Sequence, residues 1–248
     1  MTFSHFSGER FITCSKCGDL AVWEDDEVLE KISLGANIEK CIRNDKGQVL
    51  SGGKENELKL WDLETKKPIY TSKNVPKDFL ELRIPVWIKS ISSVPNSELI
   101  AVGTHYNHYR LYDVRAKRRP VISINWEEFP ISSIISTDKY SYVANTKGDM
   151  GKLDLRTGKL LNKYLGSTGS IRSISLHPTE PYIASVGLDR FLRVHNTETR
   201  QIMFKFYLKT RLNCVLFTGK EVESKKDDVW DELEVLSGEV GQKRKRVE

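Results

Sequence analysis

The sequence contains no residue pattern that would build a metal centre. Its four cysteines include a single CxxC pair, Cys14 and Cys17, and its five histidines are scattered along the chain. A structural zinc site needs a second ligand pair at suitable spacing, and the sequence shows none. The pattern therefore favours reduced, partly buried thiols over a zinc site, and we expect no cofactor.

Long apolar runs are also missing. No stretch is long and apolar enough for a membrane-spanning helix, and residues 1–6 lack the apolar core of a secretion signal. We therefore expect a soluble intracellular protein with no membrane partner. The sequence also shows no carboxylate, histidine and nucleophile in a recognisable catalytic pattern. We expect a protein that is not an enzyme and takes no small-molecule substrate.

What the sequence does contain is a unit that recurs five times. Its members read LAVWED, LKLWDL, YRLYDV, GKLDLR and LRVHNT, anchored on Trp23, Trp61, Tyr112, Leu153 and His195. The intervals between anchors are 38, 51, 41 and 42 residues. A period of about 40 to 45 residues with four short strands per unit indicates a β-propeller blade. The sequence therefore predicts an all-β propeller with about five visible blades, a rigid disc that presents loops to partners.

The fifth unit shows the four strands of a blade most clearly, at residues 170–176, 182–187, 191–196 and 201–208. After it, residues 211–217 (RLNCVLF) resemble one extra first strand with nothing behind it. Because each blade covers the apolar face of its neighbour, a missing blade leaves an open side. Either this strand pairs with the first unit and closes a small ring, or, as we favour, the chain lacks N-terminal blades.

Composition divides the chain into two predicted domains. Residues 1–218 carry a net charge of +7 and form the propeller, whereas residues 219–248, with nine acidic and seven basic residues, carry −2 and form a disordered tail. Within the tail, a short amphipathic helix either docks a partner or folds back on the propeller. Its docking residues would be Val229, Trp230, Leu233 and Leu236. A basic cluster is typical of nuclear import or nucleolar retention signals, although such runs also occur as solubilising tails. It consists of Lys243, Arg244, Lys245 and Arg246.

An insertion at residues 72–86 accounts for the longest interval and joins two blades. It carries the basic residues Lys73, Lys77 and Arg83 among apolar ones. Binding residues concentrate on loops that a rigid scaffold positions, which makes these three candidates for binding RNA or a larger particle. The alternative is that Phe79 and Leu82 pack the loop onto its own blade; a mixed outcome would turn the apolar residues inward and Arg83 outward.

Basic residues also recur in the hairpins between the third and fourth strands of successive blades. We expect these hairpins on one face of the disc, where their cations can neutralise phosphates of folded RNA. Lysine and arginine are also common at exposed turns, so this pattern is weaker than the repeat. The candidates are Arg115, Lys117, Arg118, Arg119, Arg156 and Lys159. An aromatic group at His105, Tyr106, His108 and Tyr109 either stacks on an unpaired base or packs between blades.

The repeats resemble the WD-repeat superfamily in three features: the Trp61–Asp62 pair, the Asp189 turn and the blade length. The Gly-His pair that usually opens such a repeat is absent throughout. That histidine normally bonds the turn aspartate, so we expect blade rigidity in this chain to depend more on packing.

Longer stretches are similar to the nucleolar WD-repeat factors of large ribosomal subunit assembly. They are KNVPKDFLELRIPVW at 73–87, YRLYDVRAKRRPV at 109–121, the fifth unit at 170–196 and DDVWDELE at 227–234. The resemblance implies a seven-bladed propeller in the nucleolus that docks on pre-60S particles, near ribosomal RNA and assembly factors, and is released by an AAA-type ATPase. The alternative is a WD-repeat substrate receptor or scaffold of a ubiquitin ligase or chromatin complex.

Overall fold

The computed structural model describes residues 3–7, 10–24 and 27–218, and over these residues the regular secondary structure consists of β-strands. None of the described residues belongs to a helix that could span a membrane. The chain divides into two compact units, residues 1–217 and 218–248. The predicted tail helix and basic cluster lie outside the described residues.

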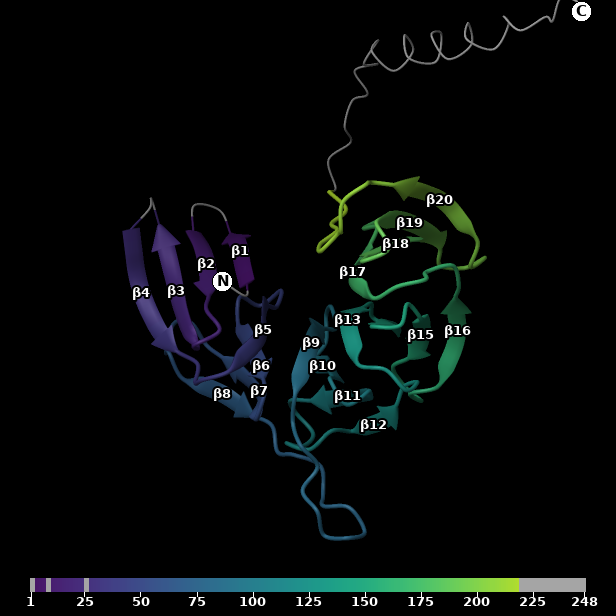
Figure 1. Ribbon diagram of the computed structural model, residues 1–248. Helices are drawn as coiled ribbons and strands as arrows, with labels where there is room; N and C mark the ends of the chain where they lie inside the picture. Colours follow the sequence, from purple (N-terminus) through teal and green to yellow (C-terminus); the bar gives the residue numbers. More distant parts are fainter. Residues whose placement is uncertain (1–2, 8–9, 25–26, 219–248) are drawn as a thin grey trace, which may run out of the picture. The chain divides into compact units, whose positions relative to one another are not determined.

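Among the residues that the structure describes, twenty strands form five antiparallel sheets of four strands each (Figure 1). The first sheet contains β1 (Phe3–Ser7), β2 (Arg10–Cys14), β3 (Asp19–Glu24) and β4 (Glu27–Ser33). The second contains β5 (Ile38–Arg43), β6 (Val49–Gly53), β7 (Asn56–Trp61) and β8 (Pro68–Thr71), and the third β9 (Ile88–Ser93), β10 (Leu99–Thr104), β11 (His108–Asp113) and β12 (Ile122–Asn125). The fourth contains β13 (Ile131–Ser136), β14 (Tyr140–Asn145), β15 (Met150–Asp154) and β16 (Leu160–Tyr164), and the fifth β17 (Ile171–Leu176), β18 (Tyr182–Gly187), β19 (Phe191–Asn196) and β20 (Ile202–Tyr207).

Within each sheet, every strand pairs with the next one along the chain. The sequence pattern predicted this order because strands of five or six residues alternate with short turns. The first unit is complete, although few residues precede its second strand. Its β1 pairs with β2 from Phe3 opposite Cys14 to Ser7 opposite Arg10, which gives five full blades.

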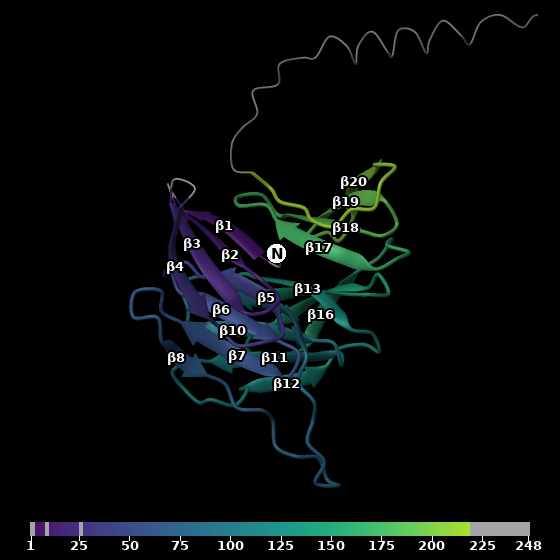
Figure 2. The ribbon, with the colours of Figure 1, turned by 60° about the vertical axis from the view of Figure 1, so that its left-hand side comes forward.

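The core lies between the sheets rather than within any one of them. One cluster joins Ile12 and Leu20 of the first sheet to Ile38 and Trp61 of the second, and three more follow at the next sheet pairs. The inner strands β1, β5, β9, β13 and β17 contact one another in that order; β1, β5, β13 and β17 are labelled in Figure 2. Each sheet therefore buries the apolar face of its neighbour, as in other stacked repeats. The all-β propeller prediction is confirmed.

Residues 211–217 do not form the extra strand that the sequence predicted. They lie along the fifth sheet instead, where the backbone N–H of Leu212 donates to Gly187 O at 3.2 Å and that of Phe217 to the Ser175 hydroxyl at 3.2 Å. The ring of Phe217 also packs edge-on against His177, with the centroids 5.1 Å apart. A strand needs a ladder partner, and the described residues offer this segment none.

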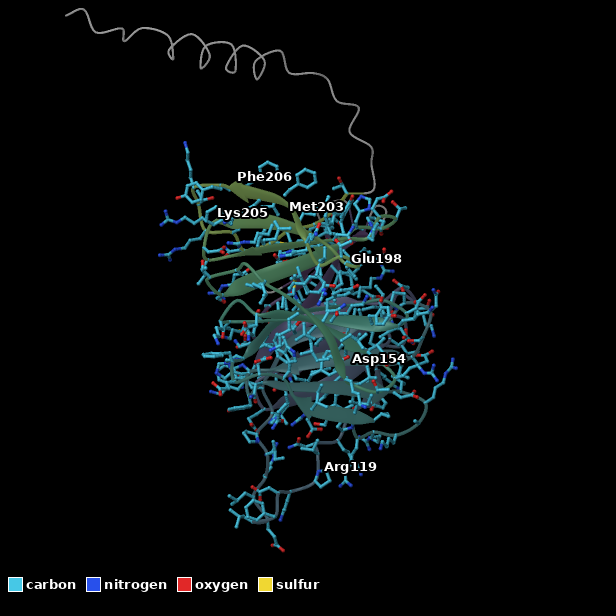
Figure 3. All side chains as sticks on the ribbon, turned by 90° about the vertical axis from the view of Figure 1, so that its right-hand side faces the viewer. Arg119, Asp154, Glu198, Met203, Lys205 and Phe206 are labelled. Atoms are coloured by element: carbon cyan, nitrogen blue, oxygen red, sulfur yellow. The ribbon has the colours of Figure 1, made fainter. Side chains whose placement is uncertain are left out.

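The outer strand of the fifth sheet is exposed along its whole length. Phe204 and Phe206 pair with Val194 and Leu192 of β19 and are 51% and 53% exposed. The corresponding ladder positions of the second and fourth sheets hold buried tyrosines, because a following sheet covers them. No described sheet follows the fifth, so Phe206 and Met203 remain at its outer side (Figure 3).

Candidate functional site

The 72–86 insertion leaves β8, extends away from the sheets and returns to β9 (Figure 1). The apolar residues at its tip are exposed to solvent: Phe79 is 93% exposed, Leu80 61% and Leu82 60%. The alternative that Phe79 and Leu82 pack the loop onto its blade is therefore wrong. The predicted mixed arrangement fails for the apolar residues, which are exposed, whereas Arg83 remains 63% exposed and pairs with Glu55 of the second sheet at 3.1 Å.

The base of the insertion is joined to the long hairpin of the third sheet, residues 114–121. The backbone N–H of Lys73 donates to Arg118 O at 2.8 Å, and Nε of Arg118 donates to Thr71 O at 2.7 Å. Nη1 of Arg110 reaches Oδ1 of Asn74 at 3.4 Å. The insertion and the hairpin of the third sheet thus form one surface.

We call this surface the basic edge. It consists of the exposed residues Lys73, Lys77, Lys117, Arg118 and Arg119. Figure 3 shows Arg119 beside the base of the insertion, with Asp154 and Glu198 of the next two hairpins on the same side of the sheets. The hairpin of the third sheet carries Lys117, Arg118 and Arg119, and Lys73 is bonded to it, which gives these cations a common rigid support; Lys77 lies further out on the insertion.

The remaining candidates lie elsewhere or are already paired. Arg156 and Lys159 belong to the hairpin between β15 and β16, on the fourth sheet, where both are exposed. Arg115 pairs with Glu98 at 3.4 Å, and Lys46 contacts the same carboxylate. Glu98 comes from the turn between the first two strands of its sheet. In an antiparallel meander these turns share a face with the hairpins of the third and fourth strands, so this face is mixed in charge.

The hairpins that carry these cations share an aspartate turn. Oδ1 of Asp113 accepts the backbone N–H of Arg115 at 2.9 Å, and Oδ1 of Asp154 accepts that of Arg156 at 3.0 Å. The backbone N–H of Arg156 and the hydroxyl of Thr157 lower the pKa of Asp154, because hydrogen bonds favour the ionised carboxylate. The turn therefore fixes the backbone from which the basic side chains extend.

Most of the aromatic group near the third sheet is packed, and Tyr106 is 38% exposed. Tyr109 is buried, and Nδ1 of His108 lies 2.6 Å from Oδ1 of Asn125. The ring of His105 lies against Trp87, with the centroids 4.0 Å apart. Burial lowers the pKa of both histidines, which favours their neutral form. The geometry therefore matches the packing alternative better than base stacking.

A buried ion pair holds the turn of the fifth blade. Nη1 of Arg193 donates to Oδ2 of Asp189, and both side chains are almost fully buried. This arginine supplies the partner that the missing histidine would have provided, so rigidity does not depend on packing alone. The sequence signal was an Asp and an Arg four residues apart across a tight turn. In the second sheet, Trp61 Nε1 donates to the buried Ser51 hydroxyl at 2.9 Å.

Within the described residues, no group of three or more His, Cys, Asp or Glu side chains is arranged to hold a metal ion. Cys14 and Cys41 are buried, and Cys17 and Cys214 are exposed. A hollow of about 560 Å³ between the first two sheets is lined by charges of both signs, including Arg43 and Asp62.

Residues 158–196 match the family described as "WD domain, G-beta repeat". This stretch runs from the fourth hairpin to the end of β19, so it contains the inner three strands of the fifth blade. This chain is a WD-repeat protein. The five stacked sheets of four strands agree with that assignment over the rest of the described residues.

Several longer WD-repeat and ribosome biogenesis proteins are similar to this WD-repeat protein. "WD repeat-containing protein 74" of Bos taurus is 39% identical over 225 residues, which cover 85% of this chain and 58% of the relative. The protein of the same name in Homo sapiens is 38% identical over equal shares. "Ribosome biogenesis protein NSA1" of Meyerozyma guilliermondii is 31% identical, covering 74% of this chain and 58% of the relative. The chain thus spans less than two thirds of these relatives.

Among solved structures, the computationally designed Ika8 protein superimposes with a TM-score of 0.73, covering 88% of this WD-repeat protein and 65% of the designed chain. The two sequences are 14% identical. A likeness at that identity concerns the fold alone.

Proposed function

We propose that this WD-repeat protein is a non-catalytic scaffold in large ribosomal subunit (60S) biogenesis and pre-rRNA processing. The observation that carries the proposal is the similarity to the "Ribosome biogenesis protein NSA1" of Meyerozyma guilliermondii, at 31% identity over 74% of this chain. A rigid stack of sheets that presents exposed loops suits binding rather than catalysis. Its partners would be pre-ribosomal particles with their RNA and assembly factors, in the nucleus and nucleolus.

The basic edge is the surface that we assign to ribosomal RNA. Lys117, Arg118 and Arg119 follow one another on a hairpin whose backbone is bonded to the insertion at Lys73. Arg118 uses Nε to anchor itself on Thr71 O, which leaves its terminal nitrogens for a phosphate. Each phosphate neutralised releases counterions, so binding would weaken as salt rises. Arg156 and Lys159 would extend this contact along the fourth sheet.

Charge reversal tests the basic edge. A Lys117→Glu/Arg119→Glu variant should lose most of its co-sedimentation with pre-60S particles, because two favourable phosphate contacts become repulsive. A Lys209→Glu/Arg211→Glu variant changes the net charge equally at exposed positions beyond the fifth sheet and should sediment like the unmodified protein. Equal loss in both variants would point to net charge rather than a site.

If the unmodified protein itself failed to recover ribosomal RNA and recovered a ubiquitin ligase or chromatin complex instead, the proposed function would be wrong.

The tail is assigned two roles within the same proposal. Val229, Trp230, Leu233 and Leu236 would dock a protein, and the AAA-type ATPase expected to release the chain is one candidate. Trp230→Ala should then reduce recovery of a protein partner and leave RNA recovery unchanged.

The basic cluster of the tail would direct the chain to the nucleolus. Replacement of Lys243, Arg244, Lys245 and Arg246 by alanine should therefore spread a fluorescent fusion into the cytoplasm. An unchanged nucleolar distribution of the fusion would contradict a targeting role for the basic cluster.

A further inference from the structure

The tip of the insertion, residues 78–82, exposes more apolar side chain than a solvent-facing turn needs. Three of its five residues are large and apolar, and Phe79 keeps 93% of its surface in water. Burial of a phenylalanine side chain is favourable, and the tip does not obtain that gain from the described residues of its own chain. An exposed apolar cluster of this kind marks an interaction site.

The tip is also held in one conformation. Oδ1 of Asp78 accepts the backbone N–H groups of Leu80 and Leu82, both at 2.9 Å. The backbone adds Asp78 N–H to Leu82 O at 3.1 Å and Glu81 N–H to Asp78 O at 3.0 Å. Glu81 takes a left-handed φ of 60°, which a non-glycine residue adopts at a cost. Four hydrogen bonds hold that turn closed, with Phe79 at its apex.

The stalk below the tip is fixed as well. Nδ2 of Asn74 donates to Ile84 O across the two arms of the insertion, and its Oδ1 accepts the backbone N–H of Val75 at 2.9 Å. Arg110 reaches the same Oδ1 from the third sheet. A rigid apolar tip loses little conformational entropy on binding, which is the property of a residue that anchors an interface.

The charges around the tip decide what kind of partner fits. The tip, residues 78–82, carries two carboxylates, Asp78 and Glu81, and no basic residue. This net negative charge opposes phosphates, whereas the two leucines beside Phe79 match an apolar cleft. We propose that the tip inserts Phe79, Leu80 and Leu82 into a hydrophobic cleft of a protein partner. The tip and the basic edge then divide the surface, with protein held at the tip and RNA at the hairpin.

Site-specific photo-crosslinking tests this inference. The full chain is produced with p-benzoylphenylalanine at position 79, or at position 165 as a control, because Leu165 is also strongly exposed on a connection between sheets. Irradiation of the purified assemblies should link position 79 to one defined peptide of one protein, and position 165 should not yield that peptide. Crosslinks to RNA, to a second copy of this chain, or to nothing above the control would each overturn the proposal.

Substitutions make the test quantitative. Phe79→Ala should weaken binding to the crosslinked protein at least tenfold, as loss of a central aromatic anchor does, while the unfolding midpoint stays unchanged. Asp78→Ala should weaken it less, because it loosens the turn and keeps the apolar side chains. If Phe79→Ala and the unmodified chain bound the crosslinked protein with equal affinity, the inference would be wrong. The proposed scaffold role is judged separately by particle sedimentation, so either can fail alone.

Discussion

The phenol hydroxyl of Tyr164 donates a 3.0 Å hydrogen bond to the backbone carbonyl of Thr197, one sheet further along the chain. Tyr70 makes the same contact with Lys117 O, also at 3.0 Å, between the second and third sheets. In both cases a tyrosine on the outer strand fastens the hairpin of the next sheet. The apolar clusters include both tyrosine rings, and these hydrogen bonds add a polar contact at the outer strands of these two junctions.

Removing either hydroxyl should loosen one junction between sheets. Tyr164→Phe and Tyr70→Phe are each expected to lower the free energy of unfolding by about 1–2 kcal/mol, since a carbonyl loses its partner while the ring stays in place. Urea denaturation measures the change. Tyr106→Phe removes a hydroxyl from a more exposed tyrosine and should cost less than about 0.5 kcal/mol. Equal effects of all three variants would contradict a role for the junction bonds.

The buried pair of Asp189 and Arg193 should respond differently to single and double substitution. Arg193→Met leaves a carboxylate buried without its cation and is expected to cost about 3–5 kcal/mol. Asp189→Leu/Arg193→Met removes both charges and should recover most of that loss. Urea midpoints measure both, and yield of folded protein reports on the single variant if it is too unstable to purify. No recovery in the double variant would argue against the pair.

The four thiols should fall into two classes. Cys17 and Cys214 are exposed and should react quickly with Ellman's reagent in the native protein. Cys14 and Cys41 should react only in denaturant, because they are buried, and because the hydrogen bond with Cys14 and burial raise the pKa of Cys41. Cys17→Ser should lower the number of thiols that react quickly in the native protein by one. Four fast thiols in the native state would refute the packing between the first two sheets.

Local patterns made most of the fold predictable. Third strands such as β7 and β19 alternate buried and less buried residues, whereas second strands such as β6 and β18 are buried almost throughout. Gly-Asp turns such as Gly18–Asp19 and Gly148–Asp149 separate strands, so these signals lie within one unit. The resemblance to WD-repeat factors also predicted the family to which the chain belongs. The extra strand at 211–217 was wrong because a strand depends on a ladder partner, and sequence alone does not show whether one is present.

The candidate site was harder to predict because its geometry depends on distant residues. Phe79 points outward because Asp78 closes the turn and Asn74 ties the insertion to Arg110, 36 residues away in sequence. Arg115 is paired because Glu98, 17 residues earlier, lies on the same face. Neither contact follows from composition. The sequence therefore predicted which residue types lie at the surface. It did not predict which of them pair with another side chain of the same chain.

Acid should destabilise the fourth and fifth sheets through His195. Its Nε2 lies 3.1 Å from Leu165 O, which makes that nitrogen the donor, and its Nδ1 is buried with no hydrogen-bond partner among the described residues. Burial lowers the pKa of His195, although the bond to Leu165 partly offsets it and the nearby Arg193 charge adds to it. The unfolded chain therefore binds a proton at higher pH than the folded chain.

The sign of the effect follows from that difference. The stabilising contribution of neutral His195 is complete above its ordinary pKa of about 6.5 and is lost as the pH falls toward the lower, folded value. Urea midpoints should therefore decrease between pH 7.5 and 5.5. His195→Gln keeps a donor near Leu165 O without a titrating ring, so its midpoint should decrease less over the same range. Parallel pH profiles for the two proteins would show that His195 does not contribute.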